Sequence, residues 1–146
     1  MNMEYSWIIY ALLSAIFAGL VAIFGKIGLK GVDSGTATMI RAFVMFVFLF
    51  LVIAYQGKLV GVMDIVSGKK LMLFIVLSGI AGALSWLFYF LALQSGQVAK
   101  VASIDRLSIV FAMIFAMVFL NEKVSLRTGL SLLLIVFASV IIATDK

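Results

Sequence analysis

Residues 101–120 read VASIDRLSIVFAMIFAMVFL, an apolar run interrupted by two adjacent charges, Asp105 and Arg106. The uninterrupted stretch from Leu107 to Leu120 has 14 residues. As a helix it covers about 21 Å, which is less than the roughly 30 Å of hydrocarbon in a bilayer. If this segment crosses a membrane, both charges must enter the hydrocarbon. Charges at that depth usually face a bundle interior or a water-filled cavity.

The rest of the chain supports a membrane location. Of 146 residues, 66% are hydrophobic and only 12% are charged, whereas soluble domains carry about 25% charged residues. The sequence therefore predicts an all-α integral membrane protein forming one domain over residues 1–146, because a core this small cannot hide so much apolar surface. Five runs are long enough to span a bilayer: residues 5–25, 36–55, 71–93, 98–120 and 126–143.

Composition excludes several function classes. The chain has no Cys and no His, which removes thiolate chemistry, haem ligation and the usual zinc sites, so no metal and no cofactor is expected. The sequence offers no nucleophile–base pair, so an enzyme is not expected. The net charge of +5 comes mostly from Lys and Arg beside apolar runs, which indicates membrane anchoring rather than a nucleic-acid partner.

A helical wheel separates the two charges in residues 98–120. Neighbours on a helix diverge by about 100°, so Asp105 shares a face with Ser108 and Ala112, whereas Arg106 shares a face with Met113. The wheel predicts that Asp105 points into a packed contact. Arg106 is expected to point into a cavity or to extend toward the interface.

Asp105 then needs a cationic partner. Arg41 lies on the same side of the membrane as the start of the fourth run, so it is a possible partner. Lys26 and Lys100 are alternative partners. One reading is an ion pair that fixes the helix register. The other is substrate or proton handling, since a carboxylate in a low-dielectric site can have a raised pKa, although nearby cations oppose that shift.

The third run carries a stripe of small and polar residues with Trp86 beside it: Ser78, Gly82, Ser85, Tyr89, Ala92 and Gly96. The first run has a weaker stripe that includes Ser14. Small residues let membrane helices pack closely, which is one reading of both stripes. The other reading is that Ser85, Trp86 and Tyr89 line a cavity, because a buried hydroxyl or indole N–H needs a partner.

The connections give three local predictions. Asp33 or Ser34 is the expected N-cap of the second helix, and Ser125 that of the fifth. Residues 59–66, LVGVMDIV, are too short to span and are expected to lie in the membrane interface.

The cations are almost evenly divided between the two sides of the membrane. Five crossings put the termini on opposite sides. One side then holds five cations, Lys58, Lys69, Lys70, Lys123 and Arg127, and the other six, Lys26, Lys30, Arg41, Lys100, Arg106 and Lys146. A Lys/Arg imbalance normally sets orientation. The near balance allows two readings: one dominant loop decides orientation, or copies insert both ways and pair as an antiparallel dimer.

Several motifs resemble the EamA-type drug/metabolite transporter superfamily, and its short five-span bacterial and archaeal members most closely. They are YALLSAIFAGLVAIFGKIGLKGV at residues 10–32, LFYFLAL at 87–93, ASIDRLS at 102–108 and FLNEKVS at 119–125. The resemblance implies half of a ten-helix inverted-repeat transporter, hence a homodimer in the cell membrane of a bacterium or archaeon. It also implies that the third and fourth helices help to wall the cavity.

The sequence departs from the family pattern at three places. The first run contains no acid, since Glu4 lies at its edge, so the proton coupling of distant four-span relatives does not carry over. Ser103 stands where short members commonly have Pro, which leaves a Pro-induced helix break in doubt. Asn121 stands where the turn often carries Gly.

The leading hypothesis is a homodimeric secondary transporter of a small metabolite or drug-like solute. Its alternatives are a flippase for a lipid-linked substrate and a non-transporting accessory subunit. Arg41 and Arg106 suit an anionic group, and the aromatic residues suit an apolar body. The candidate substrate-binding residues are Ser14, Arg41, Ser85, Trp86, Tyr89, Asp105 and Arg106.

Overall fold

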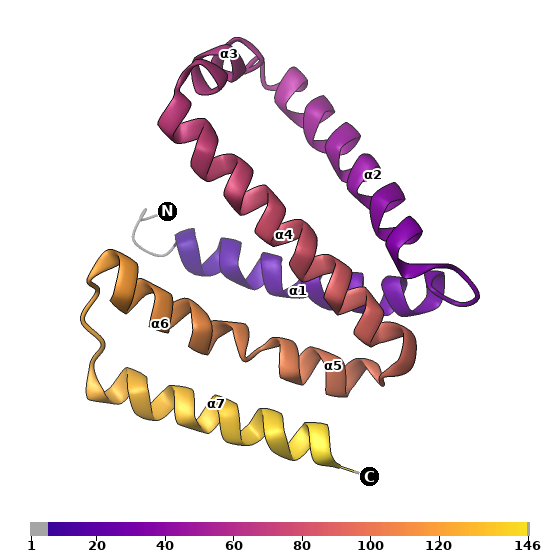
Figure 1. The fold of residues 1–146 in the computed structure, drawn as a ribbon, viewed down its shortest axis with the longest axis vertical. Coiled ribbons are helices and arrows are strands. Elements are labelled where there is room, and N and C mark those ends of the chain that lie inside the picture. The colour runs from indigo at the N-terminus through magenta and orange to yellow at the C-terminus, as the bar shows by residue number, and fades with distance from the viewer. Residues whose placement is uncertain (1–5, 146) are drawn as a thin grey trace. The chain divides into compact units, whose positions relative to one another are not determined.

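The computed structural model describes residues 6–145, so Glu4, Tyr5 and Lys146 lie outside the described residues. These residues form helices throughout (Figure 1): α1 Ser6–Gly28, α2 Ser34–Tyr55, α3 Val60–Ser67, α4 Lys69–Ser95, α5 Val98–Asp105, α6 Ser108–Leu120 and α7 Leu126–Thr144. Within residues 6–145, five stretches are long and apolar enough to cross a membrane, with α5 and α6 together forming one of them. The all-α fold with five spans is confirmed.

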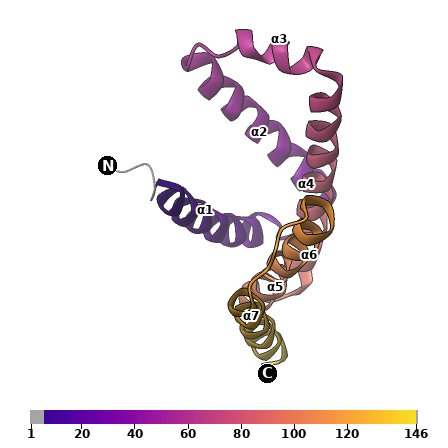
Figure 2. The same cartoon turned by 90° about the vertical axis from the view of Figure 1, so that its left-hand side faces the viewer.

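The chain divides into two units. One contains residues 27–94 and therefore α2, α3 and α4; the other contains residues 1–26 and 95–146. In the first unit α2 and α4 run in opposite directions (Figure 1), and Figure 2 shows them converging away from α3. The amide of Gln94 closes that converging end by donating to the Val32 carbonyl at 2.8 Å.

Both ends of α2 follow standard capping chemistry. Asp33 is the N-cap, as predicted, and its carboxylate accepts from the Thr36 backbone N–H at 2.7 Å. At the other end Gly57 has a φ of 69°, the left-handed conformation that glycine adopts without steric cost. The N–H groups of Gly57 and Lys58 satisfy the carbonyls of Ala54 and Ile53, so the helix ends in a Schellman motif.

The predicted interfacial segment forms α3, a helix of 8 residues with no buried side chain. It is too short to cross a bilayer, and it connects the diverging ends of α2 and α4 (Figures 1 and 2). A short apolar helix of this kind suits the boundary between headgroups and acyl chains.

In the second unit α7 runs back along α5 and packs against it (Figure 1). Two buried serines lie at this contact, where the Ser103 hydroxyl donates to its own helix at the Lys100 carbonyl, 2.8 Å away. The Ser139 carbonyl lies 3.5 Å from the same hydroxyl. Small side chains permit this close approach. Ser125 caps α7 as predicted, accepting from the Thr128 N–H at 3.2 Å.

The turn that joins α6 to α7 begins at Asn121, whose φ of 53° is left-handed. The next N–H, that of Glu122, donates back to the Ala116 carbonyl at 3.3 Å. Asparagine is the commonest substitute for glycine in this conformation. The departure from the family pattern at this position is therefore compatible with the turn.

The expected continuous helix over residues 98–120 is wrong. It breaks at Arg106 and Leu107, although no proline is present. Across the break the hydrogen bonds change to i→i−3: Leu107 donates to Ile104, Ile109 to Arg106, and Val110 to Leu107. A 3₁₀ turn advances about 120° per residue instead of about 100°, so the faces of α5 and α6 are not in phase.

Candidate functional site

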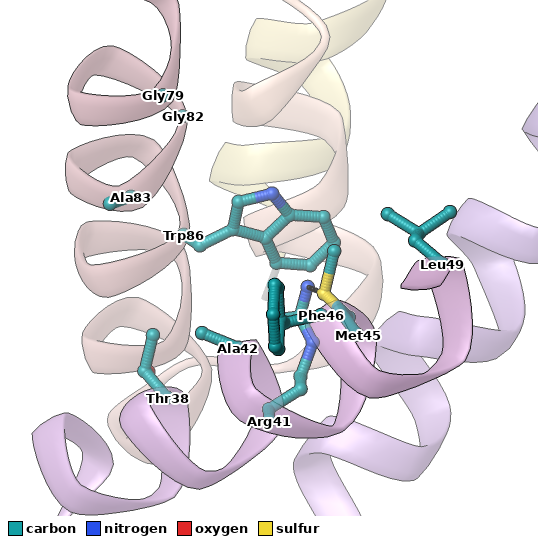
Figure 3. A pocket seen from close by; sticks show the side chains of 10 residues that line it. All are labelled: Thr38, Arg41, Ala42, Met45, Phe46, Leu49, Gly79, Gly82, Ala83 and Trp86. Atoms are coloured by element: carbon teal, nitrogen blue, oxygen red, sulfur yellow. Dashed lines mark hydrogen bonds between the residues drawn. The ribbon is translucent and has the colours of Figure 1, made fainter. Parts of the chain in front are cut away.

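A cavity of about 370 Å³ lies between α2 and α4, within one unit. We call it the α2–α4 cavity, and Figure 3 shows its lining. The residues that line it are Thr38, Arg41, Ala42, Met45, Phe46, Leu49, Gly79, Gly82, Ala83 and Trp86. Its volume is at the small end of the roughly 300–1,000 Å³ that ligand pockets occupy.

Helical spacing explains the α2 wall. Thr38, Arg41, Met45 and Leu49 recur every three or four residues and so share one face. Arg41 is seven residues beyond the start of α2 at Ser34, which puts its backbone roughly 10 Å along the helix. A charged side chain therefore starts well inside an apolar span.

Arg41 is stacked against aromatic rings of α4. Its guanidinium carbon lies 3.4 Å from the centroid of the Trp86 ring and 4.7 Å from that of Phe90. Figure 3 shows the side chain reaching from α2 to the face of the indole. Such cation–π contacts contribute about 0.5–1 kcal/mol when exposed and about 2 kcal/mol or more when desolvated.

The polar contacts of Arg41 are incomplete. Nη2 donates to the Met45 sulfur at 3.4 Å, which is a weak acceptor. Nη1 is buried and has no hydrogen-bond partner among residues 6–145. A buried donor without an acceptor is rare in native proteins and costs free energy. The guanidinium is therefore the one chemically unsatisfied group identified in this wall of the cavity.

The aromatic residues of α4 form a cluster that holds Trp86 in place. Tyr89 meets Trp86 edge-on, with centroids 6.1 Å apart and planes at 81°. Phe90 is buried and its ring centroid is 5.7 Å from that of Trp86. Edge-to-face contacts of this kind are favourable for aromatic quadrupoles, so the indole face is fixed toward α2.

The cavity face of α4 differs from the predicted stripe. Gly79, Gly82, Ala83 and Trp86 line the cavity, whereas Ser85 is exposed and outside it. Tyr89 is half-buried and supports Trp86 without lining the cavity. The predicted stripe follows the small and polar residues of α4. In the structure Arg41 packs on Trp86, so the neighbouring face of α4 lines the cavity. Gly82 is common to both.

Sequence reasoning missed the α2 wall apart from Arg41. The missed residues are Thr38, Ala42, Met45, Phe46 and Leu49. A usable signal was present, because Thr38 and Arg41 are polar residues one turn apart in an otherwise apolar span. Projecting their face along the helix gives the remaining positions.

Asp105 and Arg106 lie at the end of α5, and both are exposed in the chain. The packed contact that the wheel predicts for Asp105 is wrong within the single chain. The prediction assumed one continuous helix through residue 120, and the break begins at Arg106.

The break also changes the surroundings of Arg106. It lines a hollow of about 500 Å³, with Ser108, Ile109, Ala112 and Ile135. The wheel had assigned Ser108 and Ala112 to the face of Asp105. The helix breaks at Arg106 and Leu107, so the wheel for one continuous helix does not apply, and these residues line one hollow with Arg106. Whether Arg106 faces a substrate cavity or extends toward the interface stays a prediction, and no methionine is among the residues that line this hollow.

Two of the proposed partners for Asp105 donate to carbonyl groups. Lys26 donates from Nζ to the Gly96 carbonyl at 2.9 Å. Lys100 donates from Nζ to the Asp145 carbonyl. Arg41 and Asp105 belong to different units, so their pairing stays a prediction.

Ser14 is exposed on α1 and lines neither the α2–α4 cavity nor the Arg106 hollow.

The fold and these two hollows define a multi-pass membrane protein with charged groups inside its spanning helices. Residues 5–144 match the model of the EamA-like transporter family. The chain belongs to this family of membrane transporters. It is 40% identical over 141 residues, covering 97% of this chain and 99% of the relative, to a Sinorhizobium sp. protein named "Uncharacterized transporter in cobO 3'region". No solved structure matches.

Proposed function

We propose that this chain is one half of a homodimeric secondary transporter, which moves a small metabolite or drug-like solute across the cell membrane of a bacterium or archaeon by alternating access. The α2–α4 cavity is the observation that carries the proposal. It combines a volume of metabolite size, apolar walls and a cation whose polar contacts are incomplete. Few convergent polar groups in an apolar cavity are typical of small-molecule sites.

The dimer is proposed from the number of spans. Five spans put the two termini on opposite sides of the membrane, and many transporters combine two inverted halves around a central site. With five cations on one side and six on the other, the positive-inside rule favours neither orientation strongly. An antiparallel pair of identical chains would supply both halves.

The proposed substrate pathway includes Arg41 and Trp86 in the α2–α4 cavity, and Asp105 and Arg106 at the break between α5 and α6. Discontinuous helices commonly form substrate or ion sites in transporters, because the freed backbone groups and helix ends face a cavity. Three candidate residues line neither hollow of the single chain. We propose that a second copy of the chain contributes them to the site: Ser14, Ser85 and Tyr89.

Reconstitution tests the proposal. The purified chain in proteoliposomes should transport solutes from a metabolite and drug library, and crosslinking in the bilayer should trap a dimer. Labelling of single-Cys variants at both termini should find each terminus on both sides of the membrane. A uniform orientation would remove the antiparallel arrangement. A monomer that binds a different membrane protein and transports nothing would instead support an accessory subunit.

A further inference from the structure

The charge of its lining limits which ligands the α2–α4 cavity can bind. Arg41 is the one charged residue among the ten that line it. Thr38 is the nearest hydroxyl in sequence, and that hydroxyl already donates to the Ser34 carbonyl at 2.7 Å. The remaining walls are glycine, alanine, methionine, leucine and aromatic side chains. The cavity therefore holds a positive charge with no carboxylate in its lining.

Neighbouring groups satisfy only part of that charge. The ring faces of Trp86 and Phe90 attract the guanidinium, and the Met45 sulfur accepts one weak hydrogen bond. Nη1 stays buried without an acceptor in the described part of the chain. A charged side chain within a membrane span usually pairs with a counter-charge. An anion entering the cavity would supply both the missing acceptor and the missing charge.

The charge of Arg41 limits the charge of that anion. A phosphate dianion carries two negative charges, and the lining of this cavity offers the single positive charge of Arg41. Two negative charges would leave one uncompensated in an apolar setting, which is strongly unfavourable. A carboxylate carries one charge and has two oxygens that suit the planar fork of an arginine.

We propose that the α2–α4 cavity binds a monocarboxylate with an apolar body, whose carboxylate is held by Arg41 and whose body packs against Trp86, Phe46 and the glycine-rich wall of α4. This inference rests on the proposed transport function and deepens it by naming the substrate class. The same chemistry is available from a free organic acid and from a fatty acid of the membrane.

A charge series with one skeleton tests the proposal. The probes are 3-phenylpropanoate, 3-phenylpropanamide and 3-phenylpropylamine, which carry charges of −1, 0 and +1. Binding to the purified full chain in neutral detergent is measured by thermal shift, since a ligand of the folded state raises the melting temperature. We expect the carboxylate to bind at least about tenfold tighter than the amide, and the amine not to bind. Equal binding of all three probes would overturn the inference.

Arginine variants assign the binding to this cavity. Arg41→Gln should abolish the preference for the carboxylate. Arg41→Lys keeps the positive charge but lacks the planar, two-pronged donor group of arginine, so it should retain a weaker preference for the carboxylate. This variant replaces Arg41→Gln in the test if the glutamine variant does not fold. The matched control is Arg127→Gln, at the start of α7 and outside the cavity. Loss of the preference in Arg127→Gln but not in Arg41→Gln would contradict the assignment.

Two further binding measurements identify the source of the carboxylate. Decanoate binding alone supports a fatty acid, and 3-phenylpropanoate binding supports a free acid. If 3-phenylpropanoate binds only in Asp105→Asn, a carboxylate of the protein occupies Arg41, and the ligand inference is overturned. Transport is measured separately in proteoliposomes. Carboxylate binding without transport refutes the proposed function and leaves the site standing, whereas transport of neutral solutes without carboxylate binding refutes only the inference.

Discussion

The guanidinium carbon of Arg41 lies over the indole ring of Trp86, 3.4 Å from the ring centroid. The two residues come from the facing helices α2 and α4. This contact joins the two walls of the cavity and holds a cation in an apolar span without a counter-charge in the cavity lining.

The indole should contribute directly to ligand binding. Trp86→Leu removes the ring face that holds the guanidinium, so carboxylate binding should weaken by up to about 2 kcal/mol, or roughly 30-fold. Trp86→Phe should weaken it less, because a smaller aromatic face remains. Titration of 3-phenylpropanoate measures the effect. Trp7→Leu is the matched control, since Trp7 is exposed on α1, and an equal loss in that variant would contradict the prediction.

Filling the cavity should block function without unfolding the chain. A Cβ atom added at Gly82 meets no atom within 4 Å, so a larger side chain can begin there without a clash, and leucine is a better helix former than glycine by nearly 1 kcal/mol. Gly82→Leu should therefore remain folded while losing ligand binding and transport.

The control for this cavity-filling variant is Gly129→Leu on α7. A Cβ atom added at Gly129 also meets no atom within 4 Å, and this glycine does not line the cavity. It should bind ligand normally in the same thermal-shift assay. Normal transport by Gly82→Leu would show that solute does not use this cavity.

The charges at the helix break should be required for transport. Asp105→Asn removes a carboxylate, and Arg106→Ala removes a cation from its hollow. Each should reduce solute flux in proteoliposomes at least about tenfold while leaving the chain folded, as expected for functional charges inside a membrane. Asp64→Asn on α3 and Arg127→Ala on α7 control for general charge loss. Normal flux through both Asp105→Asn and Arg106→Ala would remove these residues from the site.

Asp33 should make stability depend on acid pH. The Thr36 backbone N–H and hydroxyl donate to its carboxylate at 2.7 and 2.9 Å, and these bonds lower the pKa of Asp33 below its ordinary value of 3.8. Because the folded-state pKa is depressed, the stabilisation is complete above the ordinary value and is lost as pH falls through the folded value.

Thermal unfolding followed from about pH 6 into acid should detect this dependence. Asp33→Asn keeps a side-chain acceptor at the N-cap, so it should preserve α2 and remove the contribution of this carboxylate to the acid sensitivity. An unchanged acid profile in that variant would show that other groups dominate.

The sequence alone determined the membrane fold of this protein. Apolar runs of about 20 residues have few stable alternatives to helices in a bilayer, because every backbone polar group must be satisfied within the segment. The caps at Asp33 and Ser125 were predictable for the same local reason, since each needs only a side-chain oxygen next to free N–H groups.

Tertiary structure decided the site. The sequence contained Arg41 and Trp86 but not their contact, which depends on how α2 faces α4. A wheel for one continuous helix separated Arg106 from Ala112, whereas the helix breaks at Arg106–Leu107 and both residues line one hollow. Which face of a helix lines a cavity depends on its packing partners and on breaks in the backbone. The hydrophobic pattern of the sequence predicts neither of these.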